Sequence, residues 1–310
     1  MALSLISPIR WPLEAIWQAV APGLPGFTAE VLPSIDSSNT ELLRRFRGSP
    51  SNSGSSRTVR TEPRPEPALL VAEQQTAGRG RLGRSWLSQR GDSLTFSLGL
   101  PLQPADWSGL SLVVGISVAD SLEPPAKEHP VSSAVPHIGL KWPNDLWLAD
   151  KKIKNQKSSH SKLAGILVET ASLEGLRYVV IGVGINIRAF ELPAPTAADS
   201  THASLLTAHT VPAPTPPGNL QALLPELDAA QTLLRVLPPL VHAVQAFEQF
   251  GFAPFQARFA RRDVLFNRAV ALSDGTVGTA CGVGESGALL VHTLAGMKEV
   301  TSSEVSVRPC

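Results

Sequence analysis

Helical spacing of apolar residues predicts three helices. The first covers residues 13–20, where four apolar positions fall on one face. The second covers residues 110–122 and has the apolar spacing of a core helix. The third covers residues 233–259, and Pro254 interrupts it because proline cannot donate the backbone hydrogen bond of a helix interior.

Short apolar or alternating runs predict the strands of a main sheet. Val31-Leu32 is a short strand that leads into a further helix, whose start is indicated by Ser38 and Glu41 at capping-box spacing. Residues 138–148 contain two strands joined by a turn, because Pro143 interrupts the ladder. The other predicted strands are residues 68–72, 94–100, 162–169 and 178–187.

The character of the chain changes at about residue 263. Short strands separated by glycine-containing turns follow at residues 269–272, 276–280, 288–291 and 305–308. They predict a small all-β domain, residues 263–310, after an α+β main domain, residues 1–262. Polar stretches without periodicity predict flexible insertions in the main domain, near residues 48–67, 151–161 and 191–219.

The composition excludes several classes of protein. Of the 310 residues, 43% are hydrophobic and 17% charged, which is typical of a globular chain, and the net charge of +1 argues against a broad nucleic-acid-binding surface. Cys281 and Cys310 lack metal-binding spacing and fit a reducing compartment. No run approaches the ~18 apolar residues of a membrane helix, and Arg10 and Glu14 interrupt the region where a signal peptide needs apolar residues. We therefore expect a cytoplasmic protein, with too few residues before the first strand for a helix-turn-helix domain.

Glycines alternate with arginines in residues 78–84, which have no regular secondary-structure pattern. Glycine lets the backbone approach a ligand closely, and its N–H groups can cradle an anion. Arg79 and Arg81 add permanent charges whose planar groups match phosphate or carboxylate. The stretch, here called the Gly/Arg loop, predicts a site for an anionic ligand, but a solvated basic loop fits this run alone equally well. Its spacing matches neither a P-loop nor a dinucleotide fingerprint.

Other polar residues have a chemical interpretation and a simpler structural one. The Ser37-Ser38-Asn39 cluster either binds a polar ligand head or only starts a helix. Asp145 lies in a turn and gains a role only if that turn faces the Gly/Arg loop. Lys162 begins an apolar strand, and Asn186 is the one polar side chain in a buried strand. None of these features identifies a function alone.

Five motifs occur together in the order found in biotin–protein ligases, a family that this chain resembles. They are residues 36–39, 78–84, 141–145, 162–169 and 182–186, and the resemblance resumes around residues 251–307. Ser38 replaces the threonine common in the first motif. A Lys/Ser-rich stretch lengthens the link before the fourth motif, but the unbroken Lys-Leu-Ala-Gly-Ile-Leu-Val-Glu run matches Lys162 to the family's lysine.

The resemblance implies a fold, a reaction and partners. The fold is α+β, a mixed central sheet with helices similar to the catalytic domain of class II aminoacyl-tRNA synthetases, followed by a small SH3-like β-barrel. The reaction uses MgATP to convert biotin to biotinyl-5'-AMP and pyrophosphate, and then transfers biotin to one lysine of the biotin carboxyl carrier protein of acetyl-CoA carboxylase. The chain resembles the monofunctional members without a DNA-binding domain, so we expect no specific DNA binding. We also expect no membrane binding and a monomeric or homodimeric protein.

The resemblance also assigns site residues by their motif positions. Catalytic roles fall on Lys162, Arg79, Arg81 and Asp145, and Asp145 either binds Mg²⁺ or orients the incoming lysine. The residues expected to bind biotin are Ser37, Ser38, Asn39, Gln75, Gly78, Arg79, Gly80, Arg81, Lys162 and Gly165. The residues expected to bind the nucleotide are Arg79, Arg81, Trp86, Lys141, Asn144, Lys162 and Asn186. Fixed positive charge fits this chemistry, because the biotin carboxylate and the triphosphate repel each other.

Two alternatives stay open at this stage. A lipoate– or octanoate–protein ligase is similar in architecture, although the Gly/Arg loop and the terminal barrel favour biotin. A non-catalytic regulator that binds biotinyl-AMP is the second alternative, and the near-neutral charge argues against its binding DNA. The acid that supports pyrophosphate exchange from ATP would distinguish the two ligases.

Overall fold

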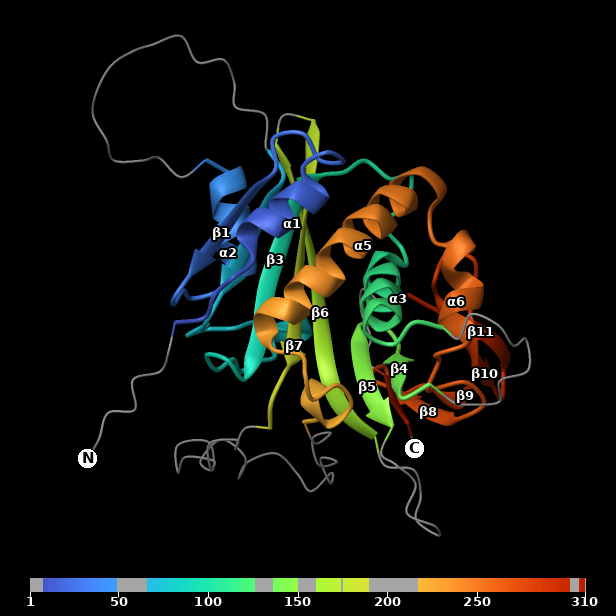
Figure 1. The fold of residues 1–310 in the computed structure, drawn as a ribbon. Coiled ribbons are helices and arrows are strands. Elements are labelled where there is room, and N and C mark those ends of the chain that lie inside the picture. The colour runs from blue at the N-terminus through green and yellow to red at the C-terminus, as the bar shows by residue number, and fades with distance from the viewer. Residues whose placement is uncertain are drawn as a thin grey trace, which may run out of the picture.

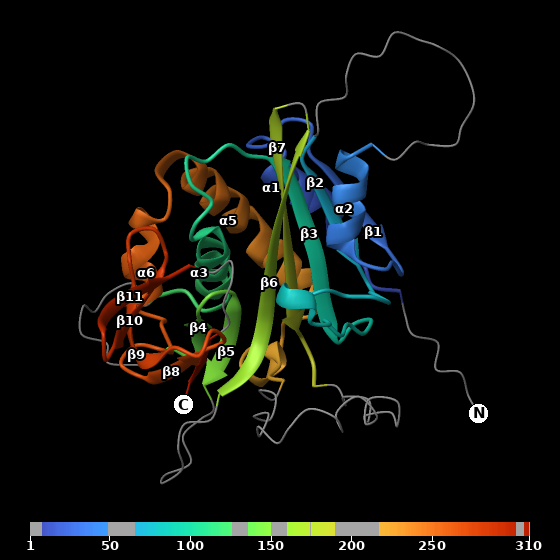
Figure 2. The same ribbon diagram turned by 180° about the vertical axis from the view of Figure 1, so that it is seen from behind.

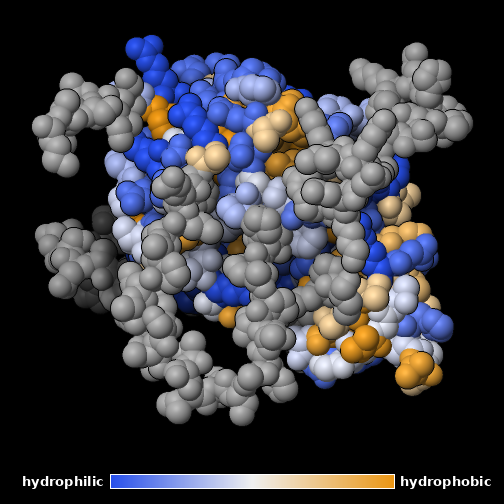
Figure 3. Space-filling model, turned by 90° about the horizontal axis from the view of Figure 1, so that it is seen from below, coloured by the Kyte–Doolittle hydropathy of each residue, from blue (hydrophilic) through white to orange (hydrophobic). Residues whose placement is uncertain are grey.

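The computed structural model describes residues 8–48, 66–125, 136–149, 160–173, 175–189, 217–301 and 307–309. The three predicted insertions lie mostly outside the described residues, and so does Cys310. Within the described residues, no helix is both long and apolar enough to cross a membrane. Seen from below, the described surface is mostly hydrophilic, with hydrophobic residues in scattered spots (Figure 3).

A mixed seven-stranded sheet forms the centre of the molecule (Figure 1). Its spatial order is β1-β2-β3-β7-β6-β5-β4; β1 and β2 are parallel, and all other neighbours are antiparallel. The strands are β1 (Thr28–Leu32), β2 (Ala68–Ala72), β3 (Ser93–Pro101), β4 (Ile138–Lys141), β5 (Asp145–Ala149), β6 (His160–Leu173) and β7 (Leu176–Asn186). The predicted mixed sheet is therefore confirmed.

Helices cover both faces of this sheet, as the front and back views agree (Figures 1 and 2). One face packs against α1 (Leu13–Val20), α3 (Leu110–Leu122) and α5 (Ala229–Phe250), which share one large hydrophobic core with it. The other face packs against α2 (Ser38–Phe46) through a smaller cluster that includes Leu42, Leu43 and Leu70. Side chains alternate between the two faces along β2, so Leu69 and Val71 point to the large core and Leu70 points to the smaller cluster.

Two helix boundaries differ from the sequence prediction. The cap of α2 is Ser37, whose side chain accepts the N–H of Thr40, so the predicted capping box at Ser38 and Glu41 is wrong. Helix α5 begins four residues earlier than predicted, because Asp228 and Gln231 form a capping box. It ends at Phe250, with Gly251 as its C-cap, before Pro254, and the short α6 (Gln256–Ala260) follows.

A second, five-stranded antiparallel sheet follows α6, in the order β11-β10-β9-β8-β12. Its strands are β8 (Ala269–Leu272), β9 (Val277–Val283), β10 (Leu289–Thr293), β11 (Gly296–Val300) and β12 (Val307–Pro309). The predicted hairpin across Asp274-Gly275 is confirmed, whereas β11 was not predicted, because Lys298 and Glu299 interrupt its apolar run. Within the described residues, the end strands β11 and β12 are not neighbours.

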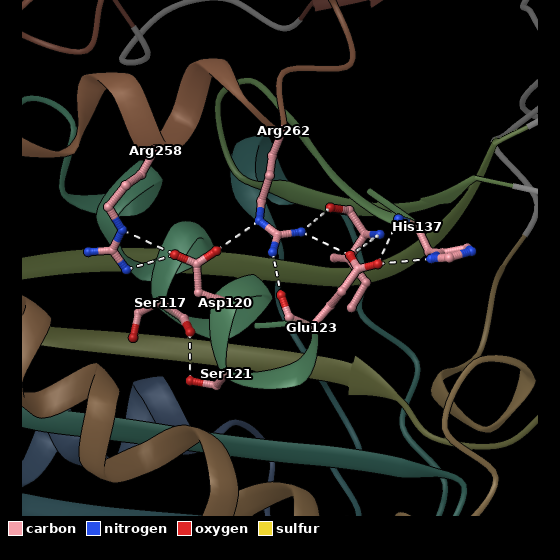
Figure 4. A network of polar contacts seen from close by, with 8 residues as sticks. Ser117, Asp120, Ser121, Glu123, His137, Arg258 and Arg262 are labelled. Atoms are coloured by element: carbon pink, nitrogen blue, oxygen red, sulfur yellow. Dashed lines mark hydrogen bonds and ion pairs between the residues drawn. The ribbon is translucent and has the colours of Figure 1, made fainter. Parts of the chain in front are cut away.

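A partly buried ionic network joins α3, α6 with the residues just after it, and the start of β4 (Figure 4). Arg262 is 6% exposed and donates to Asp120 Oδ1 at 2.9 Å, to Glu123 Oε2 at 3.0 Å and to the carbonyl oxygen of Ile138 at 2.9 Å. Arg258 donates two hydrogen bonds to Asp120 Oδ2. Burial alone would raise the pKa of Glu123, but hydrogen bonds from two backbone N–H groups and from side chains including Arg262 hold that pKa below its usual value. The network fixes the strand that leads to Lys141.

The second sheet is attached close to the turn that carries Asp145. Trp142 is fully buried, and its Nε1 donates to the carbonyl oxygen of Gly287 at 3.0 Å. The edge of β4 is paired as well, since Leu140 N donates to Arg262 O at 2.7 Å and Val264 N donates to Leu140 O at 3.0 Å. The 141–145 turn is therefore held from both sheets.

Candidate active site

One cavity brings together nearly all of the predicted site residues. It lies over β3, β7 and β6, between the N-terminus of α2, the Gly/Arg loop and the β4–β5 turn. The predicted residues that line it are Ser37, Ser38, Asn39, Gln75, Arg79, Gly80, Arg81, Trp86, Lys141, Asn144, Asp145, Lys162 and Gly165. Segments more than a hundred positions apart in sequence thus form one site.

A buried polar cluster forms one end of the cavity. Ser38, the first residue of α2, donates its N–H to Gln75 Oε1 at 2.8 Å, and the Ser38 hydroxyl lies 3.0 Å from the same oxygen. Ser97 Oγ on β3 lies 2.7 Å from Ser38 Oγ and 2.6 Å from Asn39 Oδ1. All three α2 and β3 residues are almost inaccessible to solvent. The cluster offers both donors and acceptors beside a helix N-terminus, which suits an uncharged polar ligand head.

Glu169 connects this cluster to the Gly/Arg loop. Its Oε2 accepts a hydrogen bond from Asn39 Nδ2 at 3.0 Å, and its Oε1 lies 3.2 Å from Arg79 Nη2. Arg79 also donates to Thr40 Oγ1 at 3.3 Å. One carboxylate therefore orients both an amide in the polar cluster and an arginine of the loop.

The Gly/Arg loop folds over the cavity as an irregular hairpin. Trp86 N donates to Gly78 O at 2.9 Å, and Gly80 N donates to Arg84 O at 2.6 Å. Gly78 has no room for a side chain, because a Cβ there would lie 2.3 Å from the carbonyl oxygen of Trp86. Gly78 itself does not line the cavity, so its contribution is to the loop's shape.

The indole of Trp86 lies against glycines of two strands. A Cβ on Gly184 would come within 2.3 Å of the indole, and one on Gly165 within 3.3 Å. Trp86 Nε1 is buried and has no hydrogen-bond partner within the described residues, while Lys162 Nζ lies 5.9 Å from the ring centroid. The absence of side chains at these two glycines creates the space that the ring fills.

The charged end of the cavity contains one carboxylate between two lysines. Lys162 Nζ lies 2.7 Å from Asp145 Oδ1, and Lys141 Nζ lies 3.9 Å from Asp145 Oδ2. Burial lowers the pKa of Arg81; nearby Asp145 opposes this shift and Arg84 adds to it. The Asp145 turn therefore does face the Gly/Arg loop, as its functional interpretation required.

Asn144 and Asn186 fix the backbone around Lys162. Asn144 Nδ2 donates to Ile166 O at 2.8 Å, and Asn186 Nδ2 donates to Lys162 O at 3.1 Å. Asn186 is 5% exposed and does not line the cavity. Its side chain thus supports the strand position of Lys162 in this structure, and its predicted contact with a nucleotide stays a prediction.

Several residues of the site were missed from the sequence. Ser97 and Thr95 are polar positions on buried β3, and Thr95 Oγ1 is buried beside the cavity without a partner within the described residues. Glu169 ends the Lys162 motif and contacts Asn39 and Arg79 from outside the cavity lining, whereas Val307 of the second sheet lines the cavity. A polar residue inside an apolar strand was the available signal for Thr95 and Ser97, whereas the sequence contained no signal for Val307.

Among the described residues that line the cavity, Asp145 is the one carboxylate. Within the described residues, no group of three or more His, Cys, Asp or Glu side chains is placed to hold a metal ion. Mg²⁺ commonly takes one or two carboxylates together with substrate phosphates and water. Asp145 fits such a role only in part, because both of its oxygens face lysine ammonium groups.

Comparison with known proteins relates this arrangement to a family. Residues 46–186 match the biotin/lipoate A/B protein ligase family, and residues 266–308 match the biotin protein ligase C terminal domain. The bifunctional ligase/repressor BirA of Escherichia coli is 32% identical over 291 residues, which cover 92% of this chain and 75% of that protein. Biotin–[acetyl-CoA-carboxylase] ligase of Paracoccus denitrificans is 28% identical over 284 residues, covering 89% of this chain and 98% of that one.

The structural comparison agrees with the sequence comparison. Biotin protein ligase from Aquifex aeolicus in complex with biotin and ATP has a TM-score of 0.62 and 27% identity, and the alignment covers 91% of this chain and 99% of that chain. Both sheets are therefore part of the likeness. With the five motifs gathered around one cavity and the C-terminal match, the chain belongs to the biotin–protein ligase family.

Proposed function

We propose that this chain is a biotin–protein ligase that activates biotin with ATP and transfers it to a lysine of a biotin carboxyl carrier protein. The observation that supports this most directly is the cavity itself. It has an uncharged polar cluster at one end and a cationic group, Lys162 with Arg81, at the other. Biotin has the same two ends, a polar ureido ring and a carboxylate.

In the first step, an oxygen of the biotin carboxylate attacks the α-phosphorus of ATP. The new P–O bond replaces the bond to pyrophosphate, which leaves with the electron pair. Lys162 and the loop arginines offset the repulsion between the two anions and stabilise the charge that builds up on the phosphate. Ser38, Asn39 and Gln75 hold the ureido ring, so that the carboxylate lies beside Lys162.

In the second step, the acceptor lysine's neutral amine attacks the acyl carbon of biotinyl-AMP. An amide forms, the acyl–phosphate bond breaks, AMP leaves with the electron pair, and the amine's proton passes to water or to the departing phosphate. Biotinyl-AMP is a mixed anhydride that water or stray amines would consume, so the Gly/Arg loop has to cover it until the carrier arrives. Mg²⁺ would arrive bound to the ATP phosphates and would screen their charge. Asp145 would either be a protein ligand to it or orient a lysine, the incoming acceptor or Lys162, with which it pairs.

Incubation with biotin, ATP and a carrier domain tests the proposal directly. We expect the intact mass of the carrier to rise by one biotin, and tandem mass spectrometry to locate the biotin on one lysine. Parallel reactions with lipoate and octanoate are controls for substrate class. Pyrophosphate exchange that depends on lipoate or octanoate, with none that depends on biotin, would overturn the proposal.

Other expectations from the sequence stay predictions. They are the absence of specific DNA binding, a monomeric or homodimeric state, a cytoplasmic location, and closure of the second sheet into an SH3-like barrel. A gel-shift assay and light scattering address the first two.

A further inference from the structure

Glu73 is a buried carboxylate that the proposed reaction does not use. It is 7% exposed and directly follows β2. Its N–H donates to the carbonyl oxygen of Leu32 at 2.9 Å, which extends the pairing of β1 and β2 by one residue. The sheet therefore fixes the Glu73 backbone. A carboxylate is rarely buried this deeply unless it is paired, so its partners indicate its role.

The two oxygens of Glu73 bind two separate segments. Trp11, which precedes α1, donates its Nε1–H to Oε1 at 3.0 Å. Arg90 Nε lies 2.8 Å from Oε2, and the Arg90 side chain is 35% exposed. Glu73 extends β2, and Arg90 lies beyond the Gly/Arg loop and bridges Ser93 at the start of β3. The ion pair therefore adds a side-chain link between the two legs where they leave the sheet.

Glu73 and Arg90 lie at the base of a longer hairpin, residues 73–90, whose tip is the Gly/Arg loop. Between them, a series of contacts joins the two legs of this hairpin along its length. From base to tip these contacts are Glu73–Arg90, Gln75 N to Ser88 Oγ at 2.7 Å, Trp86 N to Gly78 O at 2.9 Å, and Gly80 N to Arg84 O at 2.6 Å. Of these four contacts, the ion pair is the one nearest the base of the hairpin and the one with a formal charge on both partners.

We propose that Glu73, Arg90 and Trp11 form a positioning clamp at the base of the Gly/Arg loop that sets how long biotinyl-AMP is retained. The inference rests on the proposed function, because the loop carries Arg81 and Trp86 over the cavity in which the adenylate would form. Opening the base lets the two legs separate, which withdraws both side chains together. Adenylate synthesis needs the loop closed only while biotin and ATP react, whereas retention needs it closed until the carrier protein arrives. Loss of the clamp should therefore speed the release of biotinyl-AMP more than it slows its synthesis.

Hydrogen exchange tests the clamp without any catalysis. In Arg90→Gln, amides of residues 75–90 should exchange about tenfold faster, the factor expected from losing one charge-assisted hydrogen bond. Amides of β3, residues 93–101, should keep their wild-type exchange. Arg90→Lys should restore most of the protection, and Trp11→Phe should have a smaller effect, because it removes one hydrogen bond but keeps the ring. Lys298→Gln, which breaks an exposed ion pair with Asp274, is the matched control and should leave residues 75–90 unchanged.

Retention of the adenylate provides the second measurement. Biotinyl-AMP formed on the enzyme should dissociate about tenfold faster from Arg90→Gln than from wild type, while its rate of synthesis falls less. Unchanged exchange in residues 75–90 would overturn the clamp. An equal rise in the exchange of β3 would overturn it as well, because it would mean that the variant is destabilised as a whole. If wild type forms no adenylate, the proposed function fails, but the exchange result still decides whether the ion pair closes the loop.

Discussion

The ammonium group of Lys162 lies 2.7 Å from Asp145 Oδ1, although the two residues come from different strands. Strand β5 begins at Asp145 and pairs with β6, where Asp145 is opposite Gly165. Gly165 has no side chain, and a Cβ there would lie 3.4 Å from Lys162 Nζ. The lysine therefore reaches the carboxylate across a glycine, and the carboxylate fixes where the lysine's charge lies.

Lys162→Ala should abolish most adenylation. The variant loses the cation nearest the expected reacting carboxylate, and losing one such contact typically lowers a rate by about 10²–10³. Biotin binding should weaken but stay measurable, because the polar cluster around Ser38 is intact. Biotin-dependent pyrophosphate exchange and calorimetric biotin titration measure the two effects. Near wild-type exchange would show that Lys162 is not the catalytic cation.

Asp145→Asn separates two roles of this carboxylate. If Asp145 mainly positions Lys162, the rate should fall by about 10², the scale expected for a misplaced catalytic group, with the Mg²⁺ dependence unchanged. We expect this result, since both Asp145 oxygens already face ammonium groups. The measurement is adenylation against Mg²⁺ concentration in wild type and variant. A large rise in the Mg²⁺ needed for half-maximal rate would instead assign Asp145 to the metal.

Gly182→Ala should weaken biotin binding. A Cβ at Gly182 would lie 2.3 Å from Asn39 Oδ1, and hydrogen bonds to Ser97 and Glu169 prevent Asn39 from moving freely. Overpacking of this kind costs about 1–3 kcal/mol, or roughly a 5- to 150-fold loss of affinity if it falls on the bound state.

Gly284→Ala is the matched control for this change. A Cβ there meets its nearest neighbour at 3.8 Å, an ordinary contact, so binding and stability should both be unchanged. Calorimetry measures affinity and thermal unfolding measures stability. Wild-type affinity in Gly182→Ala would mean that Asn39 does not contact biotin.

Asp263→Asn should change how stability depends on pH. Burial raises the pKa of Asp263 from 3.8 to about 6, although backbone N–H groups of Leu265 and Phe266 oppose the shift, and Asp263 Oδ2 is buried without a partner within the described residues. The folded state therefore binds the proton more tightly than the unfolded state. As the pH rises from about 4 through 6, the carboxyl ionises more readily in the unfolded chain than in the buried position of the fold. The wild-type free energy of unfolding therefore falls over this range.

Between pH 4 and pH 7, the unfolding free energy of the Asn variant should therefore rise relative to wild type, by up to about 3 kcal/mol. Denaturant titrations at each pH provide the measurement. Asp274→Asn is the control, because its hydrogen bond from Lys298 lowers the pKa of Asp274 to about 2, outside this pH range. Parallel curves for wild type and Asp263→Asn would contradict the prediction.

Local pattern by itself determined most of the secondary structure. Helices α1 and α3 coincide with their predicted ranges, and β2 does as well. The physical reason is that apolar periodicity reflects which side of an element is buried, and this is encoded within a few turns or residues. The motif order likewise identified the family and selected the residues of one cavity, without any knowledge of their distances.

Tertiary structure decided which side chains pair. Ser37 rather than Ser38 caps α2, because Ser38 is hydrogen-bonded to Gln75 and Ser97. Glu169 meets Asn39, 130 positions away, since α2 packs against the face of the sheet that contains β7, next to β6.

The clamp at Glu73 and the contact of Trp86 with Gly184 depend on the same kind of information. Strand order and loop path bring these residues together, and neither leaves a local signal in the sequence. Apolar burial is a property of each element, but a hydrogen bond or ion pair is a property of two elements at a specific register. For this reason the sequence indicated the fold and most of the residues that line the cavity, and only the folded chain specified their partners.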